Sequence, residues 1–124
     1  MNIPANLKYT KDHEWVKIEG NIGTYGVTDH AAGELGDVVY VDIPDATAGF
    51  KAGDTFGTIE AVKTVADLYA PCGGKIVEVN TKLNDAPETI NTDPYGDGWI
   101  IKFEITNMAD LDALMDAEAY KAII

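Results

Sequence analysis

The chain has no arginine, one cysteine and two histidines among its 124 residues. Without arginine it lacks the side chain that most often clamps phosphate and carboxylate groups through paired hydrogen bonds. Nine lysines against 21 acidic residues give a net charge of −12, which disfavours a nucleic-acid-binding surface. Cys72 has no partner for an intramolecular disulfide, in agreement with a reducing compartment. With only His13 and His30 to transfer protons near neutral pH, the sequence offers little for an enzyme active site.

Long apolar runs are also missing, because no segment approaches the roughly 20 residues that a membrane-spanning helix needs. The opening residues, MNIPANLKYTKDHEW, have neither the apolar core of a signal peptide nor the arginines of a transit peptide. We therefore expect a cytoplasmic bacterial protein, or a mitochondrial matrix protein if the chain is a processed eukaryotic one. Its length predicts one domain over residues 1–124, and we expect a monomer without membrane contacts.

Short alternating segments bounded by glycine and proline predict a mainly β fold. Two helices are expected, a short one near 29–34 capped by Thr28 and a C-terminal one near 108–121. The expected strands are HEWVKIEG and NIGTYGVT around Gly20-Asn21, GDVVYVDIP at 36–44, FGTIEAV and TVADLYAP around Val62-Lys63, GKIVEV after Gly73-Gly74, and WIIKFEI at 99–105.

A faint internal repeat refines this fold class. GDVVYVD at 36–42 resembles GKIVEVN at 74–80, and GDTF at 53–56 resembles GDGW at 96–99. Two copies are too few for a solenoid. They predict a flattened barrel or sandwich of two half-motifs related by an approximate twofold. The turn between the halves, which carries Lys63, would lie at one end.

Lys63 stands where a hairpin turn is predicted, although tight hairpin turns usually contain Asn-Gly or Asp-Gly. Folding the chain here places mostly apolar residues on one face and projects Lys63 into solvent from a rigid support. An ordinary surface lysine is the simpler interpretation of the same residue. The predicted register pairs Ala61 with Thr64, Ile59 with Ala66, Gly57 with Leu68, and Phe56 with Tyr69.

Six ordered blocks that span nearly the whole chain resemble signatures of the H protein family of the glycine cleavage system. In three places the chain differs from the family pattern: Ala61 and Gly73 each replace a usual serine, and Glu34 stands where some relatives have histidine. The six blocks are HEWV at 13–16, GVTDHA at 26–31, LGDVVYVDIP at 35–44, EAVKTVAD at 60–67, APCGGKIVEVN at 70–80, and DPYGDGWI at 93–100.

This resemblance implies that the flattened sandwich is a barrel-sandwich hybrid, as in lipoyl and biotinyl carriers. It also implies a carrier protein and not an enzyme, with lipoic acid attached covalently to Lys63 as N6-lipoyl-lysine. The implied partners are glycine decarboxylase (P protein), a tetrahydrofolate-dependent aminomethyltransferase (T protein), dihydrolipoamide dehydrogenase (L protein), and a lipoate ligase or octanoyl/lipoyl transferase. The arm would carry an aminomethyl group from the first enzyme to the second and be reoxidised by the third. No metal is implied.

The resemblance also implies roles for three acidic residues. Glu60, three residues before the lysine, would help a lipoate ligase recognise the hairpin. Glu14 and Asp67 would hold the ammonium of the loaded arm through charge-assisted hydrogen bonds. Alternatively, both carboxylates are solvated surface groups.

Other carriers share a lysine at a hairpin tip. The chain could be a lipoyl domain of another multienzyme complex or a biotin carrier, but these usually have Asp-Lys-Ala or Met-Lys-Met at the tip. It could also be an H-like protein that passes lipoyl groups to other acceptors. A small acidic hydrolase is disfavoured, because no nucleophile and base motif is present.

Overall fold

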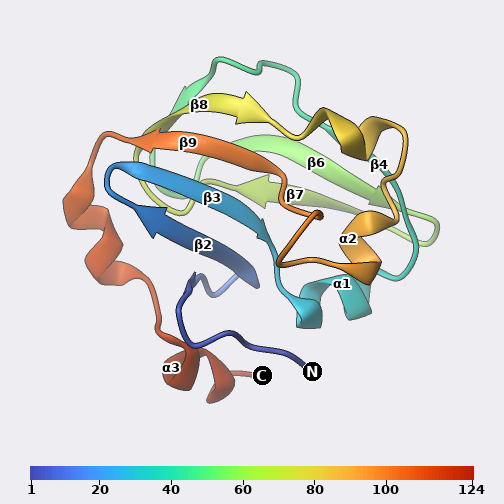
Figure 1. The fold of residues 1–124 in the computed structure, drawn as a ribbon, viewed down its shortest axis with the longest axis horizontal. Coiled ribbons are helices and arrows are strands. Elements are labelled where there is room, and N and C mark those ends of the chain that lie inside the picture. Colours follow the sequence, from blue (N-terminus) through green and yellow to red (C-terminus); the bar gives the residue numbers. More distant parts are fainter.

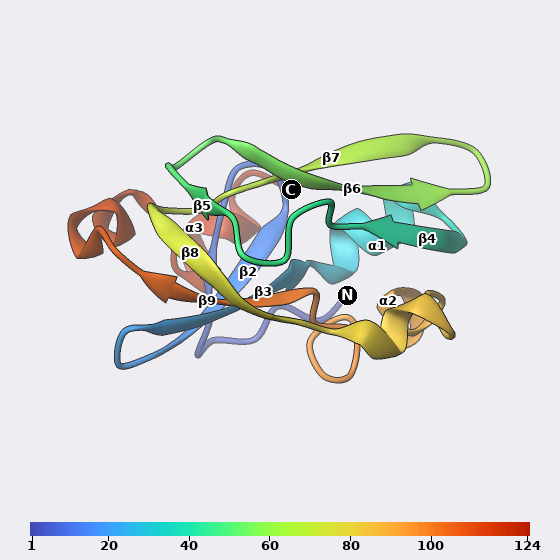
Figure 2. The same cartoon turned by 90° about the horizontal axis from the view of Figure 1, so that it is seen from above.

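A computed structural model describes all residues, 1–124, as two antiparallel sheets packed face to face (Figure 1). The larger sheet has the strand order β1-β2-β3-β9-β8-β5, and the smaller has the order β4-β6-β7. Seen from above, the two sheets form separate layers that do not close into a barrel, so the predicted flattened sandwich is confirmed (Figure 2). The strands are β1 (Lys8–Tyr9), β2 (Glu14–Glu19), β3 (Ile22–Val27), β4 (Val38–Asp42), β5 (Gly49–Phe50), β6 (Thr55–Ala61), β7 (Val65–Tyr69), β8 (Gly74–Val79) and β9 (Ile101–Ile105).

The two half-motifs predicted from the repeat carry the same irregularity. β4 pairs with β6, and the register shifts between Val38 and Tyr40. β8 pairs with β9, and the register shifts between Ile76 and Glu78. These are corresponding positions of the repeated segments, and the extra residue of a bulge increases the local twist of the strand. The repeat therefore extends from the sequence to the detailed backbone of both sheets.

The first predicted helix is confirmed as α1 (Asp29–Leu35). Thr28 caps it, because its Oγ1 accepts a hydrogen bond from the Ala31 N–H at 3.2 Å. Gly36 ends it with a φ of 75°, a conformation that favours glycine. Two further short helical segments were not predicted, the 3-10 helix η1 (Thr81–Asn84) and α2 (Thr89–Thr92).

The predicted continuous helix near 108–121 is wrong. The segment forms a 3-10 helix, η2 (Met108–Ala113), and a separate helix, α3 (Ala117–Lys121). Between them the backbone is extended, since Met115 forms a β-bridge with Tyr9 through two hydrogen bonds of 2.8 Å. Backbone pairing with the N-terminal strand thus overrides the helical spacing of the apolar residues. Asp116 then starts α3 as its cap, accepting from the Ala119 N–H at 2.8 Å.

The core lies between the two sheets. Ile59 and Leu68 face inward from the smaller sheet, while Tyr25 and Phe103 face them from the larger one. Full burial of such side chains contributes about 1.5–3 kcal/mol each. A second, smaller cluster joins the N- and C-terminal segments beside the larger sheet. None of the helices has the length and apolar character that a membrane crossing requires. The smaller cluster consists of Leu7, Tyr9, Trp15, Ala117 and Tyr120.

Candidate functional site

The β6–β7 hairpin forms as predicted near its tip. Ile59 pairs with Ala66, and the Ala61 N–H donates to the Thr64 carbonyl at 2.8 Å. The far end differs, because Thr55 pairs with Tyr69 and the predicted partner Phe56 lies at a bulge. The bulge lets the Phe56 ring enter the core, where it packs edge-on against Tyr25 with ring centroids 5.1 Å apart. Core packing therefore changes the strand register at the end of the hairpin that is far from the tip.

The turn at Val62 and Lys63 needs no glycine. His13 is the only non-glycine residue with positive φ, so neither turn residue adopts the left-handed conformation. The Val62 N–H instead donates to the Asp37 carbonyl at 3.0 Å, which ties the tip to the segment before β4. Lys63 is exposed at this fixed tip, as the sequence predicts.

The Lys63 side chain leans toward the end of α1. A Cβ on Gly36 would lie 3.3 Å from the Lys63 Cε and 3.7 Å from its Nζ. Glycine at this position therefore leaves room for the lysine stem beside the helix. Leu35, the last residue of α1, and Thr64 both line a neighbouring pocket, so the lysine stem lies close to that pocket.

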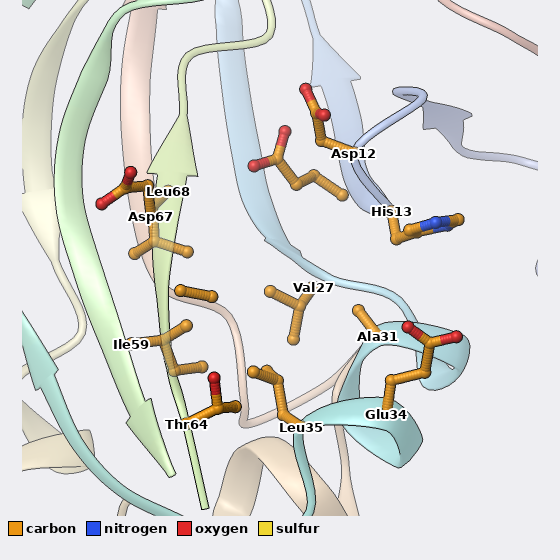
Figure 3. A pocket seen from close by; sticks show the side chains of 12 residues that line it. Asp12, His13, Val27, Ala31, Glu34, Leu35, Ile59, Thr64, Asp67 and Leu68 are labelled. Carbon is orange, nitrogen blue, oxygen red and sulfur yellow. The ribbon is translucent and has the colours of Figure 1, made fainter.

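This pocket, which we call the arm pocket, has a volume of about 240 Å³ and lies between the β6–β7 hairpin, α1 and the start of β2 (Figure 3). Its walls combine apolar side chains with acidic groups. Asp12 and Glu34 lie on the side of the pocket opposite Asp67, whose carboxyl group points away from the other lining side chains (Figure 3). The twelve residues that line it are Asp12, His13, Glu14, Val27, Ala31, Glu34, Leu35, Ile59, Thr64, Ala66, Asp67 and Leu68.

Glu14 is a buried acid in the wall of the arm pocket, with 2% of its surface exposed. Its Oε2 accepts from the Tyr25 hydroxyl and from the Tyr69 N–H at 3.0 Å, and its Oε1 accepts from the Thr10 hydroxyl at 3.0 Å. Burial raises the pKa of Glu14 to about 7, although these hydrogen bonds act in the opposite direction. Glu14 is therefore not a solvated surface carboxylate.

The other two acidic residues named from the sequence are exposed. Asp67 lies on β7 at the edge of the smaller sheet and lines the arm pocket. Glu60 lies on the outer face of the same sheet, where it pairs with Tyr40 on one side and Val65 on the other. Both neighbours are exposed, Tyr40 by 51% and Val65 by 59%. The structure thus brings Glu14 and Asp67 to one pocket and leaves Glu60 outside it.

Both histidines lie near the arm pocket, although from the sequence we expected them to offer little for an enzyme active site. The His13 and His30 rings are 4.6 Å apart, and His30 Nε2 lies 3.1 Å from a Glu34 carboxylate oxygen. Burial and the neighbouring His30 lower the pKa of His13. The sequence did not predict that His13 and Glu34 form part of the pocket wall, because the wall joins segments that are far apart along the chain.

Cys72 lies in the core, where burial raises the pKa of its thiol to about 11. It is therefore a small packing residue and not a reactive thiol.

Comparison with known proteins agrees with this geometry. The sequence model of the family described as "Glycine cleavage H-protein" matches residues 7–124. A glycine cleavage system H protein of Symbiobacterium thermophilum is 57% identical over 121 residues, which cover 98% of this chain and 94% of that protein. One of Bacteroides fragilis is 52% identical over 124 residues, covering 100% of this chain and 98% of that protein.

A solved structure is also similar to this chain. The crystal structure of a glycine cleavage system H protein from Mycobacterium marinum has a TM-score of 0.88 and 41% sequence identity, covering 97% of each chain. The family match, the sequence identities and the fold all indicate the same family. The chain therefore belongs to the glycine cleavage H-protein family and acts as the lipoyl shuttle of the glycine cleavage system.

Proposed function

We propose that Lys63 bears the lipoyl group as N6-lipoyl-lysine and that residues 1–124 act as one carrier domain. The observation that supports this best is the position of Lys63, exposed at the tip of a paired hairpin and next to the arm pocket. A paired hairpin gives the amine a rigid support, so that large partner enzymes can reach it while the carrier stays folded.

The length of the arm suits the arm pocket. The lysine side chain and the lipoyl chain together span roughly 14 Å, or about a dozen bonds. From Lys63 to Asp67 the chain advances by about 13 Å at the rise of a strand. An arm laid along β7 would therefore end near Asp67, two residues before Tyr69, whose N–H is bonded to Glu14. Apolar residues of the arm pocket, such as Leu35 and Leu68, would contact the hydrocarbon part of the arm.

When attached, the lipoyl group supplies a dithiolane that takes up an aminomethyl group and is later restored from the dithiol. We propose that the P, T and L proteins carry out these reactions, and that this chain is their substrate and not itself an enzyme. We place it, as a monomer, in the bacterial cytoplasm, in keeping with its bacterial relatives.

Glu14 and Asp67 are proposed to hold the ammonium of the aminomethyl group. Glu14 offers a carboxylate fixed by three hydrogen bonds, and Asp67 offers a second one at the rim of the same pocket. A bound ammonium favours the charged form of Glu14, so arrival of the loaded arm would release its proton. The low polarity of the pocket would strengthen this ion pair relative to one in water.

Glu60 is proposed to contact the lipoate ligase. Its carboxylate stands on the same hairpin as Lys63 and between two exposed apolar side chains, Tyr40 and Val65. An enzyme that receives Lys63 in its active site would meet this outer face next to the tip. Exposed apolar side chains rimmed by polar ones often mark a protein interaction site.

The attachment site is tested by expressing the chain with a lipoate ligase and measuring intact mass and peptide masses. We expect one lipoyl increment on the peptide that contains Lys63 and none in Lys63→Arg. An increment on another lysine, or on none, would overturn the assignment. Shuttle activity is tested separately by glycine decarboxylation with the three partner enzymes.

The ammonium contacts are tested by the lifetime of the loaded arm. Water cleaves the carbon–sulfur bond, leaving the thiol and releasing formaldehyde and ammonium. We expect faster release in Glu14→Gln with Asp67→Asn, and no change in the control Asp42→Asn, which does not line the arm pocket. An unchanged lifetime in the double variant would remove the proposal for these two residues.

A further inference from the structure

We infer that Tyr120, near the C-terminus, is a positioning residue for the arm pocket, because its hydroxyl joins two of the walls that would shield a loaded arm. The inference rests on the proposed function of Lys63. Tyr120 does not line the arm pocket itself, so it would act through the residues that its hydroxyl contacts.

The first of these walls contains His13. The hydroxyl oxygen of Tyr120 lies 2.9 Å from His13 Nδ1. His13 has a φ of 66°, a left-handed conformation that is uncommon for residues other than glycine, although histidine adopts it more often than most. It stands between Asp12 and Glu14, and all three line the arm pocket. The Tyr120 contact therefore helps to hold an uncommon backbone conformation on which the orientation of Glu14 depends.

The second wall is α1. The same Tyr120 oxygen lies 2.8 Å from Thr28 Oγ1. Thr28 is the cap of α1, and its Oγ1 also accepts from the Ala31 N–H at 3.2 Å. Ala31 and Leu35 of this helix line the arm pocket. One hydroxyl thus fixes the start of a helix relative to the His13 turn, although the two partners lie 92 and 107 residues away along the chain.

Tyr120 is itself held firmly. Its side chain is fully buried, and its ring stacks on Tyr9 with centroids 4.7 Å apart and an interplanar angle of 5°. Tyr9 is in turn paired with Met115 by two backbone hydrogen bonds of 2.8 Å. The hydroxyl therefore sits on a rigid platform, so the C-terminal segment can set the separation of the two walls.

Removal of the hydroxyl alone separates positioning from packing. Tyr120→Phe keeps the ring that stacks on Tyr9 and leaves Lys63 untouched. His13 and Thr28 each lose one partner, so both walls gain freedom to move and to admit water. Misplacement of groups by about 1 Å can change a reaction rate by up to about a hundredfold. We expect the loaded arm to lose its aminomethyl group about tenfold faster than in the wild type.

Asn80→Ala is the matched control. Asn80 is also buried, and its Nδ2 donates to the Asp97 and Trp99 carbonyls at 2.9 and 2.7 Å. It lines a different cavity, beside β4, and none of the arm pocket. This variant therefore removes two buried hydrogen bonds without touching the walls in question.

The experiment uses the full chain, lipoylated and loaded, and measures the first-order release of formaldehyde for the wild type, Tyr120→Phe and Asn80→Ala. NMR spectra of the unmodified proteins provide a second readout, the imidazole signals of His13. We expect faster release and shifted His13 signals in Tyr120→Phe only. Urea unfolding of all three proteins shows whether the two substitutions destabilise the fold to a similar extent.

Three other outcomes would overturn the inference. The first is release from Tyr120→Phe at the wild-type rate, the second is His13 signals that do not shift in Tyr120→Phe, and the third is equally fast release from Asn80→Ala. Each of these would overturn the inference and leave the proposed function intact. A wild-type chain that carries no lipoyl group on Lys63 would overturn the proposed function first and the inference with it. Peptide mapping of the same samples distinguishes these cases.

Discussion

The Tyr25 hydroxyl donates a hydrogen bond to Glu14 Oε2, the same oxygen that accepts the Tyr69 N–H. Tyr25 and Glu14 belong to the larger sheet, whereas Tyr69 ends β7 of the smaller one. One buried carboxylate therefore joins the two layers beside the arm pocket. Burial raises the pKa of Tyr25 well above its usual range, so its hydroxyl remains a donor at all physiological pH values.

Tyr25→Phe is expected to raise the pKa of Glu14 beyond its value of about 7, because the variant removes a hydrogen bond that lowers this pKa. Loss of the donor should also reduce the free energy of unfolding by about 1–3 kcal/mol at pH 8. Carbon-13 NMR of the Glu14 carboxyl group, followed from pH 4 to pH 9, measures the first effect. A pKa that stays constant or falls would show that the hydroxyl does not stabilise the charged form.

Glu14 should also make the stability depend on pH in a defined window. Its pKa is raised from 4.5 in an unfolded chain to about 7 in the fold. Its contribution to folding is therefore complete below pH 4.5 and is lost as the pH rises through 7. Relative to Glu14→Gln, the wild type should lose about 3 kcal/mol of unfolding free energy across this window. Urea unfolding of both proteins at several pH values measures it; a difference that stays constant or grows with pH would contradict the prediction.

The β hairpins could be predicted from the sequence because their determinants are local. Alternation of apolar residues and the residues at the turns place β2 and β3 around Gly20-Asn21, and β6 and β7 around Val62-Lys63. The internal repeat correctly indicated two half-motifs, since both copies form a bulged strand. Lys63 could be singled out for the same reason, as its place at the tip follows from the spacing of its neighbours.

The remaining features depend on contacts between distant segments. The helical spacing around Leu114 gave no sign that Met115 pairs with Tyr9, and so the predicted C-terminal helix is broken. Alternation also could not show that Phe56 leaves the register to fill the core between Tyr25 and Phe50. The burial of Glu14 likewise arises only when the two sheets pack together.

The break before α3 leads to a prediction about its cap. Asp116 accepts from the Ala119 N–H at 2.8 Å and begins the helix that carries Tyr120. Asp116→Ala should lower the free energy of unfolding by about 1 kcal/mol. Asp112→Ala changes an exposed aspartate in the preceding 3-10 helix and should have a smaller effect. Urea unfolding of the two variants makes the comparison; equal effects would argue against a capping role for Asp116.

Cys72 offers a test of the core between the sheets. Its side chain is fully buried, and burial raises the pKa of the thiol from 9.0 to about 11. At pH 8 this shift alone reduces the reactive thiolate about a hundredfold, and burial also excludes the reagent. Alkylation with iodoacetamide should therefore proceed only through opened molecules, so its rate should rise with urea in parallel with the unfolded fraction. Rapid alkylation in buffer, at the rate of the urea-unfolded chain, would mean that the strands around Cys72 open far more often than their packing implies.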